Sequence, residues 1–211
     1  MKKKLYEQYI QQLRQALPGE KEQNALQVIE DAVQALPEDD VKQPHFTQDH
    51  GLADHPQALA LYTDGACRHN PGPGAWAMLL MDANNKIVTE ASGSEFSTTN
   101  NRMELQAVIE GLKAAQQYFT EQKNNTPEVF LFSDSQIVVN GLQSWLAGWK
   151  MRNWRKADGS PVENVTYWQE LDLLAGQIKL HPTWVRGHNG HPQNEYCDQL
   201  ANRALDELLH S

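Results

Sequence analysis

Beyond residue 57, the apolar residues follow two kinds of spacing. Continuous or alternating apolar runs predict strands, and they occupy residues 59–66, 75–81, 87–96, 129–132 and 178–185. A period near 3.6 residues predicts helices, which start at Thr99 or Asn100 and recur over 135–144, 161–177 and 194–209. The first three strands follow one another across turns, and the later ones alternate with helices. We therefore expect an α/β fold with a mixed five-stranded sheet flanked by helices.

Residues 1–57 carry a different pattern. Apolar residues recur about every four positions on either side of Pro18-Gly19, which predicts two short amphipathic helices joined as a hairpin. The stretch after them has no sustained period and contains three prolines, so we interpret it as a linker. The expected organisation is an accessory helical hairpin at 1–43, a linker at 44–57 and a larger domain at 58–211. We expect the hairpin to pack on the larger domain, to self-associate or to bind another protein.

Three histidines recur every five residues in the expected linker, at His45, His50 and His55. This spacing is neither the register of one helix face nor a known metal-ligand spacing. We therefore interpret these histidines as part of a solvated linker rather than as a metal site.

The composition narrows the class of protein. The 211 residues carry a formal net charge of −9 and no apolar run long enough to span a bilayer, so we expect a globular protein with no membrane partner. Glu7 and Gln8 interrupt the apolar segment that a signal peptide would need, and Cys67 and Cys197 are too few for a disulfide framework. A cytoplasmic location is the expectation. The acidic balance leaves room for a local basic patch or a cation site.

Four acidic residues occupy positions where a solvated charge is not expected. Glu104 and Asp198 lie on the apolar stripes of their predicted helices, while Asp64 and Asp134 end predicted apolar strands. Strand ends and nearby helix starts form the ligand crevice of an α/β sheet, so we expect these carboxylates to converge. Because converging carboxylates repel one another, a hard divalent cation, Mg²⁺ or Mn²⁺, is the expected neutraliser. Oxygen donors alone do not select zinc.

The four acids belong to the longer segments 62–66, 98–105, 133–136 and 194–198, and two further segments, 70–74 and 184–192, lie between them. In order and spacing these segments resemble type 1 ribonuclease H, over residues 59–210. Residues 1–57 lie outside the resemblance and lack the hybrid-binding module found at the N-terminus of some relatives.

The resemblance implies an endonuclease that hydrolyses the RNA strand of RNA–DNA hybrids and leaves 5′-phosphate and 3′-hydroxyl products. It implies a two-metal-ion mechanism with two Mg²⁺ ions, for which Mn²⁺ can substitute. Asp64, Glu104, Asp134 and Asp198 are then the catalytic metal ligands, with Asp64 between the two ions. His188, on a glycine-containing loop, is expected to assist proton transfer or product release.

The resemblance also implies substrate-binding residues. Cys67, Asn100, Glu104 and Gln136 would sense the 2′-hydroxyl groups in the minor groove of the hybrid. Thr99 and Asn164 would bind a phosphate of the DNA strand, although Ser97 stands where the family often has arginine. Asn70 is a further substrate-binding candidate in the Asn-Pro-Gly loop.

A basic segment at 145–156 contains no acidic residue and interleaves tryptophans with cations. Such a surface can follow a phosphate backbone without reading its sequence. Its substrate-binding candidates are Trp145, Trp149, Lys150, Arg152 and Trp154, joined by the cations Arg155 and Lys156. The alternative interpretation is a helix whose tryptophans belong to the core and whose cations only face solvent.

Two other functions fit parts of the pattern. An integrase-like core would carry three acids with different spacing and would lack the 98–105 and 184–192 segments. A catalytically inactive hybrid-binding module would lack one of the four acids. All four are present, so a nuclease is favoured.

Overall fold

The computed structural model describes residues 9–11, 13–14, 16–34, 44, 46, 51–187 and 191–210. The chain divides into two compact units, Met1–Pro44 and His45–Ser211. His188, His45 and His50 lie outside the described residues, so the predictions for them stay predictions.

The first unit contains two helical stretches, as the apolar period predicts. Residues 9–11, 13–14 and 16 are helical, and α2 spans Glu20–Gln34. Arg14 connects the two stretches, because its guanidinium donates to Gln27 Oε1 at 2.8 Å and forms an ion pair with Glu30.

The second unit is built on a five-stranded sheet with the order β3-β2-β1-β4-β5. Its strands are β1 (Leu59–Cys67), β2 (Gly72–Asp82), β3 (Ile87–Thr98), β4 (Glu128–Ser133) and β5 (Lys179–Trp184). β1, β2 and β3 form an antiparallel meander, and β4 runs parallel to both β1 and β5. The mixed five-stranded sheet predicted from the sequence is therefore confirmed.

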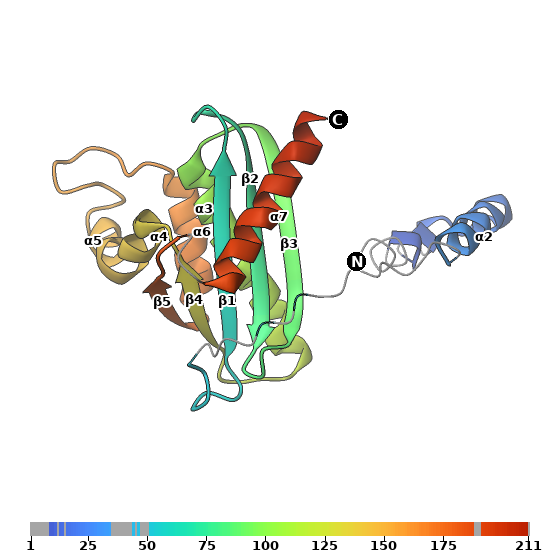
Figure 1. Ribbon diagram of the computed structural model, residues 1–211, viewed down its shortest axis with the longest axis horizontal. Helices are drawn as coiled ribbons and strands as arrows, with labels where there is room; N and C mark the ends of the chain where they lie inside the picture. The colour runs from blue at the N-terminus through green and yellow to red at the C-terminus, as the bar shows by residue number, and fades with distance from the viewer. Residues whose placement is uncertain are drawn as a thin grey trace. The chain divides into compact units, whose positions relative to one another are not determined.

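Helices cover both faces of this sheet (Figure 1). α7 (Pro192–Leu209) crosses one face, and α3 (Asn100–Glu121) with α6 (Val165–Ala175) covers the other. No helix in the described part of the chain is both long and apolar enough to cross a membrane.

The alternation along β1 divides the core into two layers. Leu59 and Leu61 belong to the cluster on the α3 side, whereas Ala60 and Tyr62 belong to the cluster on the α7 side. This period of two is the geometry of a strand that is buried on both faces.

The helix predicted at 135–144 is not one regular helix. It corresponds to α4 (Gln136–Asn140) and a single π-helical turn (η1, Gly141–Trp145), and α5 (Leu146–Met151) continues the helical stretch beyond the predicted end. Gly141 lies against the ring of Trp168 on α6, where an added Cβ would come within 2.1 Å of that ring. The break therefore occurs where the chain packs closely on an element more than twenty residues away, which no local period could predict.

Most of the expected linker belongs to the second unit, and part of it is packed in the core. Leu52 is fully buried and Phe46 is 6% exposed, both in the cluster on the α7 side of the sheet. His55 Nδ1 lies 3.1 Å from Glu128 Oε2 at the start of β4. The solvated-linker interpretation is therefore wrong for these three residues.

Candidate active site

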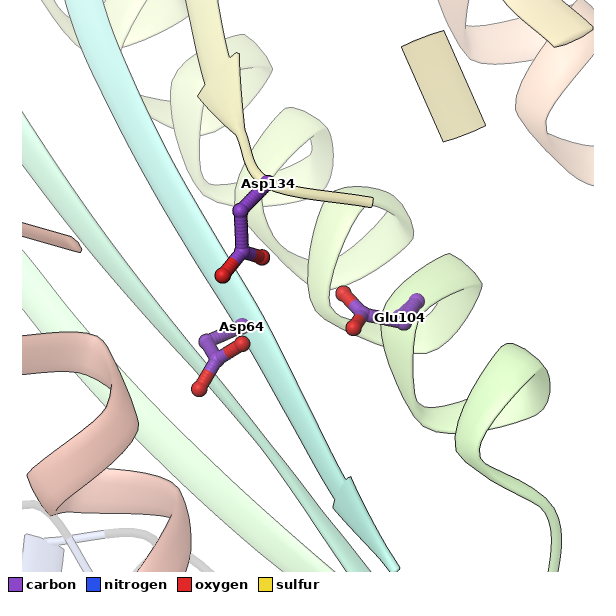
Figure 2. Close-up of side chains that lie close together, drawn as sticks. All are labelled: Asp64, Glu104 and Asp134. Atoms are coloured by element: carbon purple, nitrogen blue, oxygen red, sulfur yellow. The ribbon is translucent and has the colours of Figure 1, made fainter. Parts of the chain in front are cut away.

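The parallel pairing of β1 with β4 brings two predicted site residues together. Thr63 pairs with Ser133 at the end of this ladder. Asp64 directly follows Thr63, and Asp134 directly follows Ser133. The two aspartates lie side by side at the carboxyl end of β4 (Figure 2). Asp64 is buried in β1, whereas Asp134 is half-buried and begins the connection to α4.

The third carboxylate comes from the first turns of α3. Thr99 caps this helix, its hydroxyl accepting from Arg102 N at 3.3 Å. Glu104 lies on the buried face of α3 and points toward the two aspartates (Figure 2). Asp64, Glu104 and Asp134 each offer an oxygen, and these oxygens lie within 4.8 Å of one another.

Asp198 lies on α7 at the border of the same group. It lines the cavity of about 380 Å³ that also contains the other three acids. Among the described residues its oxygens fall outside the 4.8 Å group, and its Oδ1 accepts from Asn202 Nδ2 at 2.8 Å. The four acids thus share one cavity, and three of them are in mutual reach of a single ion.

Burial and mutual repulsion raise the pKa values of the two buried acids. Desolvation, followed by the charges of Asp134 and Asp198, raises the pKa of Asp64 to about 8. The pKa of Glu104 is raised well above its usual value, first by complete burial and then by the neighbouring aspartates. The weak hydrogen bond from Asn100 Nδ2 to Glu104 Oε1, at 3.4 Å, opposes this shift only in part. Without a cation, the cavity therefore holds protons that it would release on metal binding.

The donor set fits a hard divalent cation. Glu104 Oε2 is buried and has no hydrogen-bond partner among the described residues. The described residues that line the cavity include no lysine or arginine. Carboxylate oxygens without nitrogen or sulfur donors suit Mg²⁺ or Mn²⁺ rather than zinc.

Of the predicted substrate-binding residues, Asn100, Glu104 and Gln136 line this cavity. Asn70 Oδ1 accepts from Asn100 N at 3.1 Å, which ties the Asn-Pro-Gly loop to the start of α3. Cys67 ends β1, and its thiol lies 3.7 Å from Gly72 O.

The predicted DNA-phosphate residues are connected through one arginine. Thr99 caps α3, and Asn164 directly precedes α6 in the left-handed conformation. Arg102, one turn into α3, donates from Nε to Asn164 Oδ1 at 3.2 Å. Thr99 and Asn164 therefore lie at the N-terminal ends of α3 and α6, and each forms a hydrogen bond with Arg102.

Both interpretations of the basic segment hold in part. Trp149 and Trp154 pack against the core, and Trp145 is 40% exposed with its ring 5.7 Å from that of Trp149. Lys150 is paired with Asp172 of α6 at 2.8 Å, and Lys156 with Glu163 at 2.8 Å. Both acids lie outside the segment. The segment is therefore less positive in the folded protein than its composition indicates.

The cavity also contains residues to which no sequence pattern assigned a role. Its lining is completed by Gly65, Ser135, Ile137, Asn194 and Glu195. Asn194 and Glu195 belong to one of the matching segments, but neither periodicity nor spacing singled them out.

Comparison with known proteins decides the family. The family model described as RNase H matches residues 56–206. The Ribonuclease H of Cupriavidus pinatubonensis is 47% identical over 152 residues, which are 72% of this chain and 98% of that protein. The Ribonuclease H of Neisseria gonorrhoeae is 49% identical over 148 residues, covering 70% and 95% respectively. The chain belongs to the ribonuclease H family.

A solved structure supports the same assignment. LC9-RNase H1, described as a type 1 RNase H with the type 2 active-site motif, aligns with a TM-score of 0.61 and 34% identity, covering 72% of this chain and 73% of that one. The resemblance inferred from the sequence is thus confirmed, and the integrase-like alternative is not supported. This ribonuclease H is a metal-dependent endonuclease that hydrolyses the RNA strand of RNA–DNA hybrids.

Proposed function

We propose that Asp64, Glu104, Asp134 and Asp198 hold two Mg²⁺ ions, or Mn²⁺ in their place, with Asp64 between them. The observation that carries this proposal is the group of three carboxylates with oxygens within 4.8 Å, two of them buried, in a cavity that Asp198 also lines. Ions held by these residues would supply an activated water nucleophile and charge stabilisation for the leaving 3′ oxygen. The products are a 5′-phosphate and a 3′-hydroxyl.

The surrounding residues bind the hybrid. Asn100 and Gln136, at the cavity, recognise 2′-hydroxyl groups together with Cys67 and Glu104, which favours RNA over DNA in the strand that is cut. Asn70 supports this surface through its contact with Asn100. Thr99 and Asn164 bind a phosphate of the DNA strand.

The basic segment follows the phosphate backbone of the hybrid. Trp145 is the exposed stacking side chain, supported by Trp149 and Trp154. Lys150 and Arg152 supply positive charge, although Lys150 also forms an ion pair with Asp172. His188 moves a proton or helps product leave, a role that water can partly replace.

The first unit has an accessory role in this proposal. Residues 1–43 form a helical hairpin, 44–57 a linker whose Phe46 and Leu52 are packed into the core, and 58–211 the catalytic domain. The hairpin packs on that domain, self-associates or binds another protein. The family match begins at residue 56, which supports a catalytic domain that does not include the hairpin.

Cleavage assays of matched duplexes test the proposal. RNA–DNA, RNA–RNA and DNA–DNA duplexes of one sequence are incubated with Mg²⁺ or with EDTA, and only the RNA–DNA duplex with Mg²⁺ should be cut. Asp134→Asn should keep the fold and lose nearly all cleavage, because an amide lacks the charge that holds a divalent ion. His188→Ala should lose less.

Asp206→Asn is the matched control, because it makes the same change from aspartate to asparagine. Asp206 lies on α7, outside the cavity, where it pairs with Arg68. It should cleave like the wild type. Substantial Mg²⁺-dependent turnover by folded Asp134→Asn would overturn the metal-ligand assignment, and equal losses in Asp134→Asn and His188→Ala would overturn the division of roles.

A further inference from the structure

The backbone carbonyl of Asp134 accepts a hydrogen bond from a side chain of the neighbouring strand. It directly follows β4, so the regular β1–β4 ladder ends one residue before it. The indole Nε1 of Trp184, the last residue of β5, donates to Asp134 O at 3.0 Å. An indole N–H can only donate, and a backbone carbonyl can only accept, so the direction of this bond is unambiguous. Trp184 therefore restrains the backbone from which the Asp134 carboxylate projects.

The carboxylate of Asp134 has a second neighbour on α7. Asn194, in the first turn of that helix, is 2% exposed, and its Nδ2 lies 3.4 Å from Asp134 Oδ2. Because an ionised carboxylate only accepts hydrogen bonds, the amide nitrogen must face Asp134. The amide carbonyl is then directed away from Asp134, and Asn194 Oδ1 is buried without a partner among the residues that the structure describes.

A glycine leaves room for the carboxylate in this position. A Cβ at Gly187 would come within 2.4 Å of Asp134 Oδ2. Trp184, Gly187 and Asn194 all belong to the stretch that leads from β5 into α7. One metal-ligand candidate is thus contacted at its carbonyl and its carboxylate by uncharged residues from a different part of the chain.

We propose that Trp184 and Asn194 are positioning residues that hold Asp134 in place for the divalent ion. Trp184 restrains its backbone, and Asn194 orients its carboxylate. Residues that orient metal ligands set metal affinity without touching the metal. The inference rests on the proposed role of Asp134 as a metal ligand.

Metal binding to the full-length protein in the absence of hybrid tests the inference. Trp184→Phe keeps an aromatic ring and removes the N–H donor, while Asn194→Leu keeps a similar volume and removes the amide. Isothermal titration with Mn²⁺ should give a Kd about tenfold higher for each variant than for the wild type. The Mn²⁺ concentration that half-saturates cleavage should rise by the same factor, with the rate largely restored at high Mn²⁺.

Two further variants make the outcomes distinguishable. Trp76→Phe removes an indole from β2 outside the cavity lining and should leave the Kd for Mn²⁺ unchanged. Asp134→Asn should lose Mn²⁺ binding. If it binds Mn²⁺ like the wild type, the proposed function fails, and the inference fails with it. If only Asp134→Asn is impaired, the proposed function stands and the inference is overturned.

Thermal unfolding in EDTA separates positioning from general destabilisation. A positioning role predicts melting temperatures close to that of the wild type for Trp184→Phe and Asn194→Leu, together with the higher Kd. If Asn194→Leu does not fold, Asn194→Ser takes its place, because serine is too short to reach Asp134. An unchanged Kd for Mn²⁺ with a lower cleavage rate would mean that Trp184 and Asn194 act on the substrate and not on the metal site. This result would overturn the inference.

Discussion

Gly65 and Glu104 meet where β1 lies against α3, and the missing side chain of Gly65 makes the contact possible. A Cβ at position 65 would come within 2.5 Å of Glu104 N and 2.8 Å of Met103 C. Both atoms are backbone, so no side-chain rotation can relieve the overlap. This close approach brings the Glu104 carboxylate beside Asp64, the residue that precedes Gly65.

Gly65→Ala should therefore separate the acids. We expect about 1–3 kcal/mol of lost stability from overpacking. Cleavage should fall by about 100-fold, because displacements near 1 Å cost that much in a catalytic site. Urea unfolding and single-turnover cleavage of a hybrid measure the two effects.

Gly111→Ala, on the helix that carries Glu104, is the matched control. Its added Cβ would meet the Leu61 side chain at 2.4 Å, in the core and away from the carboxylates. It should change stability and leave the cleavage rate near that of the wild type. If the two variants lose cleavage equally, the loss in Gly65→Ala comes from overpacking of the core in general and not from separation of the acids.

The raised pKa of Asp64 predicts an unusual dependence of stability on pH. The unfolded chain releases this proton near pH 3.8, but the folded, metal-free protein keeps it until about pH 8. The folded state therefore binds more protons than the unfolded state between these pH values. The contribution of Asp64 to the free energy of unfolding falls as pH rises from about 4 to about 8. The loss amounts to at most about 5 kcal/mol for Asp64.

Urea unfolding of the wild type and Asp64→Asn in EDTA, from pH 5 to pH 8, isolates this effect. The wild-type free energy of unfolding should fall more steeply than that of Asp64→Asn, which should be the more stable protein at pH 8. Adding Mg²⁺ should stabilise the wild type more at pH 8 than at pH 5, because protons and the cation compete for the same oxygens. Parallel curves in EDTA would contradict the prediction.

The position of a stable N-terminal truncation follows from the burial of Phe46 and Leu52. Each buried side chain of this size contributes about 1.5–3 kcal/mol. A 58–211 fragment should therefore be about 3–6 kcal/mol less stable than a 45–211 fragment, which keeps both residues. Urea unfolding of the two fragments decides this, with hybrid cleavage as the check that each is folded. Equal stabilities would mean that this stretch contributes nothing to the core.

Asp172 should weaken binding of the hybrid by holding Lys150. Asp172→Asn breaks this pair and leaves Lys150 free to meet a phosphate. Binding should tighten, and the slope of log K against log salt should steepen by at most about 0.9, the value of one phosphate contact. Titrations at several salt concentrations, with Ca²⁺ in place of Mg²⁺ to suppress cleavage, measure both changes.

Glu170→Gln is the control for this measurement. It changes the net charge equally on the same helix but breaks a pair with Lys113, which lies on α3. Its slope should match the wild type. If the two variants tighten binding equally, the change in net charge alone is responsible, and Lys150 does not contact a phosphate of the hybrid.

The sequence by itself determined the secondary structure pattern, the sheet and the identity of the four acids. The apolar alternation of β1 and the stripe of α3 are local, because each follows from where neighbouring side chains point in a strand or helix. Glu104 stood out for the same reason, since a carboxylate on an apolar stripe breaks a local rule. The motif segments then identified the family without any contact being known.

Only the tertiary structure decided how these residues meet. Trp184 and Asp134 are 50 residues apart, and their bond exists because β5 ends beside β4. The pairing of Lys150 with Asp172 likewise depends on α5 lying near α6, so the charge of the basic segment could not be read from its composition. Contacts of this kind depend on which elements dock and at what distance. Gly65 permits a short distance between β1 and α3 because it has no side chain, and a missing side chain produces no local sequence pattern.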